Sequence, residues 1–331
     1  MKKSILLSAC VICISGTAFI NAQSKPSEYK IAGKIPVEGE GGYDYIACDE
    51  STGRLYVSHS TVTQVVDPKS GKLIGTIPDT KGVHGIALAT DLNKGYTSNG
   101  KDSSVSVFNL QTLAVLTKVK VTGKNPDAIL YDPFTHRIFT FNGHSSNSTV
   151  IDANTDKVIG TIKLEGKPEF AVTDGKGKVY VNIEDKSVIT MINPQTLKME
   201  QTWPIAPGKE ASGLAIDTEN HRLFAVCDNK LMIIMDAISG KVVSSLPIGD
   251  GPDAASFDPD KKRVYSSNGE GTITVIQEEK GDVFKVIENI PTQKGAKTMT
   301  IDIKTHHLFL PVAEDRKKAG SFTIIDVAPV K

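Results

Sequence analysis

This sequence of 331 residues has few cysteines and few aromatic residues, and neither sign of charge is in excess. It holds four cysteines, 6% aromatic residues, and 38 basic against 38 acidic residues. Cys10 and Cys13 fall in the apolar N-terminal run, so only Cys48 and Cys227 remain, and we expect both to be buried free thiols. The balanced charge argues against the basic surface of nucleic-acid-binding proteins, which makes nucleic-acid binding the least favoured function.

Familiar catalytic motifs are also missing. The sequence has no Gly-x-Ser-x-Gly elbow, no His-Glu-x-x-His pair, no phosphate-binding loop and no haem-attachment Cys-x-x-Cys-His. Any catalysis would therefore have to come from residues that the fold brings together. The sequence leaves the question of enzymatic activity open and favours a protein that is not an enzyme.

Long apolar runs are absent except at the N-terminus. Lysines precede an apolar run from Ile5 to Ile20, and Ala22 supplies a small residue, so residues 1–22 are typical of a signal peptide cleaved after Ala22. A Leu-Ser-Ala-Cys stretch ends at Cys10, but a lipoprotein would keep an apolar region of only about six residues, below the usual ~7–15. We therefore expect a periplasmic or secreted protein rather than a lipoprotein, with no transmembrane segment.

A short strand centred on an aromatic residue recurs along the rest of the chain at intervals of 40–44 residues. The seven aromatic residues are Tyr56, Tyr96, Phe139, Tyr180, Phe224, Tyr265 and Phe309. Each repeat contains β-rich runs separated by turns and no helical periodicity, which is typical of a four-stranded propeller blade. The sequence therefore predicts an all-β fold, a seven-bladed β-propeller with four-stranded blades, whose aromatic residues pack between adjacent blades.

The repeats define one propeller domain over residues 23–331, with blades that start near residues 42, 84, 126, 168, 211, 252 and 296. The last repeat ends without an outer strand of its own. Residues 29–36 resemble the outer strands of other blades and belong to no repeat, so we expect them to complete the last blade. This three-plus-one closure would cover the open strand edges, and we expect a monomer.

The stretch Leu55-Tyr56-Val57-Ser58, the outer-strand stretch Gly75-Thr76-Ile77 and the exported context resemble the YVTN or YncE-like propeller repeat family of exported bacterial proteins. The resemblance covers the chain after the leader and implies the seven-bladed ring. Its repeat motifs are structural, and members of the family mostly have no assigned function. Related rings include lactonases and the streptogramin lyase, so the fold alone does not select a chemistry.

The repeat alignment places polar side chains at the mouth of the central channel. Twelve residues before each aromatic, or one residue later, the predicted innermost strands begin with Asp44, His84, Asp127, Glu169, Ser212, Asp253 and Lys297. A second set follows the aromatics by a few residues and includes His59, Asn99, Asn142 and Asn268. We predict a ligand site formed by Asp44, His84, Asp127, Glu169, Asp253 and this second set.

Oxygen donors dominate the predicted site, which suits Ca²⁺ or Mg²⁺, and Asp44, Asp127, Glu169 and Asp253 are the candidate metal ligands. His84 is the best candidate for a catalytic residue, because turn chemistry does not require histidine there. The competing interpretation is structural, since turns favour Asp and Asn for backbone reasons.

The leading hypothesis is an exported binding scaffold for an unidentified small ligand or extracytoplasmic protein, held at the channel mouth. The alternative is a Ca²⁺- or Mg²⁺-dependent lactonase or lyase at the same place, with His84 as the general base.

Overall fold

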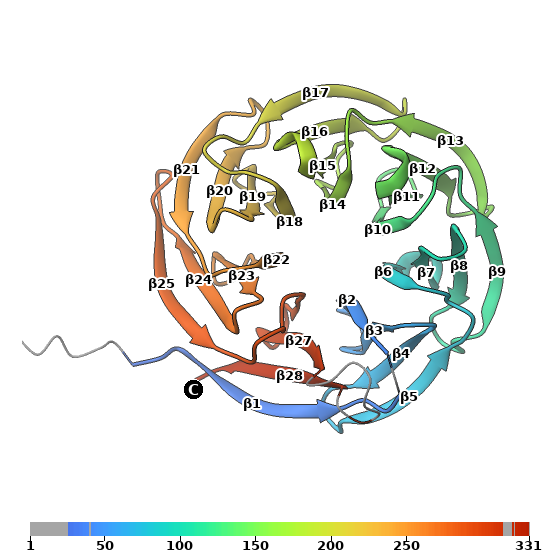
Figure 1. Cartoon of the computed structure of the whole chain (residues 1–331), viewed down its shortest axis with the longest axis horizontal. Helices are drawn as coiled ribbons and strands as arrows, with labels where there is room; N and C mark the ends of the chain where they lie inside the picture. The colour runs from blue at the N-terminus through green and yellow to red at the C-terminus, as the bar shows by residue number, and fades with distance from the viewer. Residues whose placement is uncertain (1–25, 40, 314–319, 321, 331) are drawn as a thin grey trace, which may run out of the picture.

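Seven antiparallel sheets of four strands each surround a central axis in the computed structural model, which describes residues 26–39, 41–313, 320 and 322–330 (Figure 1). The predicted all-β, seven-bladed propeller is thereby confirmed. In the described part of the chain, helix is confined to three short 3₁₀ turns, η1 (Thr90–Leu92), η2 (Gly143–Ser145) and η3 (Glu184–Lys186). None of the described helices is long and apolar enough to cross a membrane. The expected signal peptide, residues 1–22, lies outside the described residues.

Each blade runs from the axis outward. The innermost strands are β2 (Tyr43–Cys48), β6 (Val83–Ala89), β10 (Pro126–Asp132), β14 (Pro168–Thr173), β18 (Ala211–Asp217), β22 (Pro252–Asp258) and β26 (Thr300–Asp302). The second strands are β3 (Leu55–His59), β7 (Lys94–Asn99), β11 (Arg137–Asn142), β15 (Val179–Ile183), β19 (Arg222–Cys227), β23 (Arg263–Asn268) and β27 (His307–Ala313). The third strands are β4 (Val62–Asp67), β8 (Ser104–Asn109), β12 (Asn147–Asp152), β16 (Val188–Asn193), β20 (Leu231–Asp236), β24 (Thr272–Glu278) and β28 (Phe322–Pro329). Outer strands complete six blades: β5 (Lys72–Ile77), β9 (Val115–Lys120), β13 (Lys157–Lys163), β17 (Lys198–Pro204), β21 (Val242–Pro247) and β25 (Phe284–Pro291).

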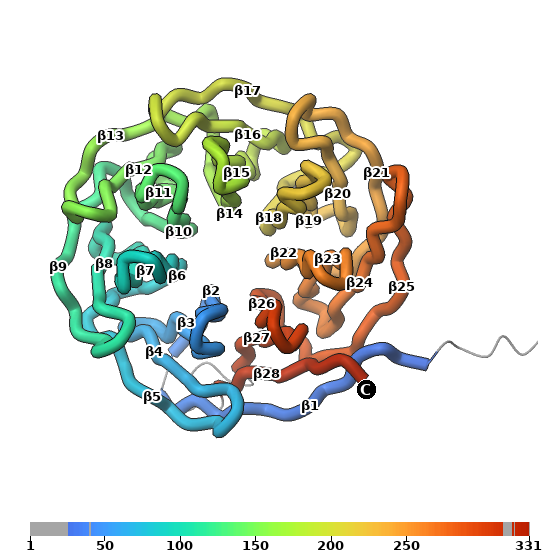
Figure 2. Tube along the Cα trace, turned by 180° about the vertical axis from the view of Figure 1, so that it is seen from behind, coloured from blue at the N-terminus to red at the C-terminus, as the bar shows by residue number. Residues whose placement is uncertain are grey.

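The seventh blade takes its outer strand from the other end of the chain. Strand β1 (Tyr29–Pro36) pairs antiparallel with β28, so that the first and last strands lie side by side (Figures 1 and 2). The register runs from Tyr29 opposite Pro329 to Pro36 opposite Thr323. The Tyr29 hydroxyl also lies 2.6 Å from that of Tyr265 in blade six. The expected three-plus-one closure is confirmed, and β1 joins blade seven to blade six as well.

The seven repeated aromatic residues are all buried, with at most 3% of any of them exposed. Tyr96 in blade two lies in one apolar cluster with Ile138 and Ile151 of blade three. Tyr180 of blade four donates its hydroxyl hydrogen to the carbonyl of Ala237 in blade five, at 3.1 Å. The repeat is therefore a packing signal, because each large ring fills the space between two sheets.

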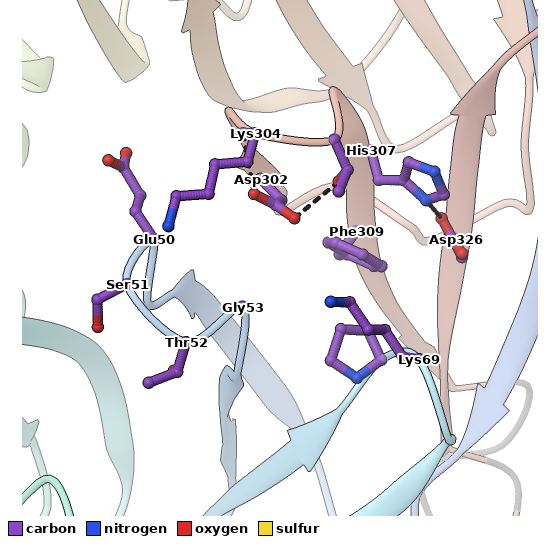
Figure 3. A pocket seen from close by; sticks show the side chains of 12 residues that line it. Glu50, Ser51, Thr52, Gly53, Lys69, Asp302, Lys304, His307, Phe309 and Asp326 are labelled. Carbon is purple, nitrogen blue, oxygen red and sulfur yellow. Dashed lines mark hydrogen bonds and ion pairs between the residues drawn. The ribbon is translucent and has the colours of Figure 1, made fainter.

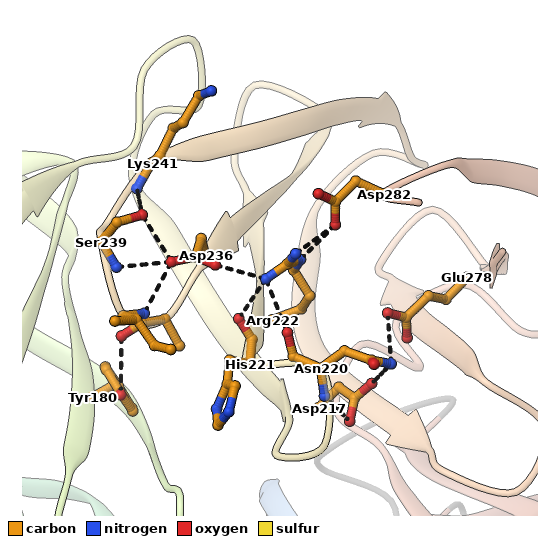
Figure 4. Close-up of polar contacts among 12 residues, drawn as sticks. Tyr180, Asp217, Asn220, His221, Arg222, Asp236, Ser239, Lys241, Glu278 and Asp282 are labelled. Carbon is orange, nitrogen blue, oxygen red and sulfur yellow. Dashed lines mark hydrogen bonds and ion pairs between the residues drawn. The ribbon is translucent and has the colours of Figure 1, made fainter. Parts of the chain in front are cut away.

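Aspartates hold turns at one end of the blades, and blade five is an example. In blade five, Asp217 accepts hydrogen bonds from the amide of Glu219 (2.8 Å) and from Nδ2 of Asn220 (2.7 Å). Beside this turn, the Arg222 guanidinium lies 2.7 Å from Asp236 and 2.6 Å from Asp282 (Figure 4). These carboxylates therefore serve the turns and the contacts between blades.

The two cysteines in the described part of the chain, Cys48 and Cys227, are free thiols. Cys227 is buried as expected, whereas Cys48, which we expected to be buried, is only half-buried. It ends strand β2, where the innermost strand emerges at the end of the channel.

Candidate functional site

Five of the predicted site residues stand at the start of innermost strands, each as the second residue of its strand. They are Asp44 in β2, His84 in β6, Asp127 in β10, Glu169 in β14 and Asp253 in β22. In every one of these strands the pairing with the second strand is interrupted at this residue. Such irregularities re-aim a side chain that would otherwise follow the ladder. We call these five residues the cup.

His84 joins three blades. Its Nδ1 lies 2.6 Å from Oδ2 of Asp44 in blade one and 3.7 Å from Oδ1 of Asp127 in blade three. Each of the three residues has one potential metal-ligand atom that lies within 4.8 Å of the corresponding atoms of the other two. A Cβ atom on Gly100 would come within 2.6 Å of His84 Nε2, so a glycine at this position leaves room for the ring. The three side chains offer two carboxylates and an imidazole to a common point.

Two lysines pair with the remaining carboxylates of the cup, Glu169 and Asp253. Lys167 Nζ lies 3.0 Å from Oε2 of Glu169 and also pairs with Glu184, while Lys297 Nζ lies 2.8 Å from Oδ2 of Asp253. Together with Glu184, the carboxylates of the cup outnumber the two lysines and His84. The channel mouth therefore holds more negative charge than its own cations can neutralise.

Three of the acidic side chains of the cup have raised pKa values. Burial, opposed by the charge of His84, raises the pKa of Asp127 to about 6. Burial and the neighbouring charge of Asp127 raise the pKa of Glu169 to about 7. Burial also raises the pKa of Asp253, although Lys297 opposes the shift. Near neutral pH some of these carboxyl groups are therefore protonated. A bound cation would stabilise their ionised forms and lower their pKa values.

The pKa of His84 is raised as well, but in a histidine a raised pKa favours the charged form. Burial lowers the pKa of its imidazole, but the hydrogen bond to Asp44 and the charge of Asp127 outweigh burial and raise it overall. The imidazolium form is therefore more favourable here than in an ordinary histidine, and it would act as a counter-charge to Asp44 and Asp127.

An aromatic pair closes the bottom of the cup. Tyr45 of blade one and Phe170 of blade four meet across the channel, with ring centroids 5.6 Å apart at an angle of 35°. Each directly follows a cup residue in its strand, Asp44 and Glu169 respectively. Burial, and then the charge of Asp127, hold the pKa of Tyr45 well above its ordinary value, so its hydroxyl stays neutral. We call this pair the floor; sequence reasoning missed it, although both aromatics stand beside predicted site residues.

The second predicted set does not meet the cup. His59, Asn99, Asn142 and Asn268 are at most 2% exposed. Asn99 Nδ2, for example, donates to the hydroxyls of Ser104 (3.1 Å) and Ser106 (2.9 Å) in the next strand of the same blade. His59, Asn142 and Asn268 make equivalent bonds with Gln64, with Asn147 and Thr149, and with Thr272 and Thr274. The structure places these side chains inside their own blades, where they tie the second strand to the third.

A separate hollow of about 360 Å³ opens between blades one and seven at the other end of the strands (Figure 3). Lys69 and Lys304 line it together with His307, whose Nδ1 lies 2.7 Å from Oδ1 of Asp326. The turn from Glu50 to Gly53, which follows the end of β2, forms another wall. Since the cup stands at the start of β2, this hollow is not part of it.

Comparison with known proteins supports the fold and a distant kinship. No family model matches the chain. It is 25% identical over 228 residues to antigen Lp49 of Leptospira interrogans, a match that covers 61% of this chain and 47% of that protein. It is 22% identical over 225 residues to the uncharacterized protein YncE of Salmonella typhimurium (67% of this chain, 52% of that protein). It is 23% identical over 255 residues to the uncharacterized protein YncE of Escherichia coli K12, covering 70% of each.

The chain thus spans about half the length of antigen Lp49 and of the Salmonella protein. Among solved structures, the hydrazine synthase of Kuenenia stuttgartiensis superposes with a TM-score of 0.71 at 16% identity, covering 83% of this chain and 94% of that one. The WD40 repeats of RRP9 give 0.77 at 8% identity, covering 91% and 100%. These two likenesses show the propeller fold alone, whereas the sequence matches confirm the resemblance to the YncE-like propellers.

Proposed function

We propose that the chain is an exported binding protein whose cup at the channel mouth takes a small cation. The observation that supports this most is the convergence of two carboxylates from separate blades, Asp44 and Asp127, around His84, with Glu169 and Asp253 at the same mouth. Such a grouping costs free energy in the empty site, because buried like charges repel and lose hydration. A bound cation would offset that cost.

The cation is either a metal ion such as Ca²⁺ or Mg²⁺ or an organic ammonium group. Carboxylate oxygens suit both hard metal ions and ammonium donors. Asp44 and Asp127 are the metal ligands that the geometry favours, because their oxygens already lie beside one point with His84. The aromatic floor of Tyr45 and Phe170 also fits an ammonium group, which is attracted to the face of such rings.

The hydrolytic alternative asks His84 to act as a general base. Its Nδ1 already lies 2.6 Å from Asp44, and the direction of its pKa shift favours the protonated ring more than in an ordinary histidine, which makes proton abstraction less favourable. A basic groove for nucleic acid is equally at odds with an acidic mouth. Binding of a cation is therefore favoured over both.

Calorimetric titration of the chain from residue 23 onward at pH 7.5 tests the proposal, using CaCl₂, MgCl₂ and putrescine as separate titrants. We expect saturable binding of at least one of them, and at least a tenfold loss of affinity in the double variant Asp127→Asn/Glu169→Gln. Both substitutions keep the shape of the side chain and remove its charge. The titrant that binds distinguishes a metal ion from an ammonium group.

A matched control changes two exposed carboxylates at the other end of the blades, Glu219→Gln and Glu279→Gln, which belong to no cluster of potential metal ligands among the described residues. This variant loses the same formal charge and should bind as the parent does. Absence of saturable binding for all three titrants, or equal affinity in the two double variants, would overturn the proposal.

A further inference from the structure

Beyond the floor the channel is lined mainly by apolar side chains. A cavity of about 300 Å³ lies there, and its walls include Ile46, Ile86, Leu88, Ile129, Ala255 and Met299. Tyr45 and Phe170 also border it, so the floor separates this space from the cup. These side chains come from five blades and are apolar, while Tyr45, Cys48, Ser256 and Thr300 supply the polar side-chain groups on the wall.

A second cavity of about 680 Å³ continues from the first. The two share Ile86, Leu88, Ile129 and Phe170 as walls, and the second adds Val172 and Ile216. It also reaches residues in the turns that follow the innermost strands, including Asp91. The apolar space therefore runs from the floor toward the end of the propeller opposite the cup.

Charge is nearly absent from this space. Asp91 is the one charged residue among those that line the two cavities; it is exposed, and it accepts a hydrogen bond from the Tyr131 hydroxyl at 2.8 Å. Burial raises the pKa of the Cys48 thiol to about 12, so this group on the wall is neutral as well. A charged ligand would lose its hydration here without gaining a partner.

The walls are also built in advance. Ile46, Ile86, Ala255 and Met299 are each less than 10% exposed, because neighbouring blades hold them in place. A preformed cavity of a few hundred Å³ whose walls are mostly apolar, with a minority of polar groups, is the usual setting for a small ligand. We infer that the channel beyond the floor is a second binding site, which takes one uncharged, compact aromatic or aliphatic molecule. This inference is independent of the cation proposed for the cup.

Titration with N-phenyl-1-naphthylamine, an uncharged dye that fluoresces in apolar surroundings, tests the inference on the chain from residue 23 onward. We expect one saturable dye site per chain and displacement of the dye by naphthalene. The substitution Ser256→Phe, at a half-buried wall position outside the apolar clusters between blades, narrows the cavity and should weaken dye binding at least tenfold. Ile86→Ala enlarges the cavity and should leave binding within about threefold of the parent.

The cup variant Asp127→Asn/Glu169→Gln serves as the control, since its changes lie on the other side of the floor and should not alter dye affinity. Circular dichroism identifies which variants are folded. If Ser256→Phe does not fold, displacement by naphthalene from the parent chain decides the matter. Failure of the folded parent to bind dye saturably, failure of naphthalene to compete, or unchanged binding in folded Ser256→Phe would overturn the inference.

Discussion

A chain that begins at residue 37 is expected to lose its monomeric folded state, because it lacks the closing strand β1. Tyr29 and Ile35 would be removed from two apolar clusters, at a cost of about 1.5–3 kcal/mol each. The antiparallel pairing with β28 would be lost as well, which leaves a buried strand as an open edge. Since typical domains are stable by only ~5–15 kcal/mol, we expect unfolding or association.

Size-exclusion chromatography and thermal melting compare this chain with a control that begins at residue 26 and so keeps the whole of β1. The control should be a folded monomer. A monomeric chain from residue 37 that melts at the temperature of the control would show that the ring does not depend on β1.

In the absence of a bound cation, the protein is expected to lose stability as the pH rises from 5 to 8. The pKa of Asp127 is raised to about 6 and that of Glu169 to about 7, so the folded state holds protons that the unfolded chain releases. Groups with raised pKa values contribute stability at low pH and lose it as the pH rises through the folded pKa. The raised pKa of His84 acts in the same direction. For this coupled group we expect a loss on the order of 3 kcal/mol.

Urea unfolding at pH 5, 6, 7 and 8 measures this dependence. The variant Asp127→Asn/Glu169→Gln should lose the share that comes from the cup, whereas Glu278→Gln should remove only the separate share of a distant carboxyl whose pKa is also raised to about 7. The series stops at pH 5 because turn aspartates such as Asp152 and Asp236 have lowered pKa values. Their contribution is lost as the pH falls below about 4. Stability that rises from pH 5 to 8, or the same slope in parent and cup variant, would contradict the proposed electrostatics.

The fold could be predicted from the sequence because the residues that specify a blade recur in every repeat. A buried aromatic at the same place in each repeat, such as Tyr56 or Phe309, is a packing requirement that recurs with every blade. The closing strand could be predicted for a related reason. The last repeat lacks an outer strand, and residues 29–36 resemble an outer strand that belongs to no repeat. The same alignment brought Asp44, His84 and Asp127 to one mouth.

Side-chain direction could not be predicted in the same way. Asn99 and Asn142 follow the aromatics at the correct offset for the mouth, but a buried amide needs partners and finds them in its own blade. The interruptions of pairing that re-aim the cup residues depend on how two strands align, which a single strand does not reveal. The contact between Tyr45 and Phe170 depends on the diameter of the ring, because it joins blades one and four.

Binding of a cation in the cup is tested most directly by a crystal structure of the chain at pH 8 with the titrant that binds most tightly. The expected result is a bound cation in contact with carboxylate oxygens of Asp44 and Asp127. For Ca²⁺ these distances should be about 2.3–2.6 Å, and for an ammonium group about 2.7–2.9 Å. A cation bound elsewhere, with the carboxylates of the cup touching none, would contradict the proposed function.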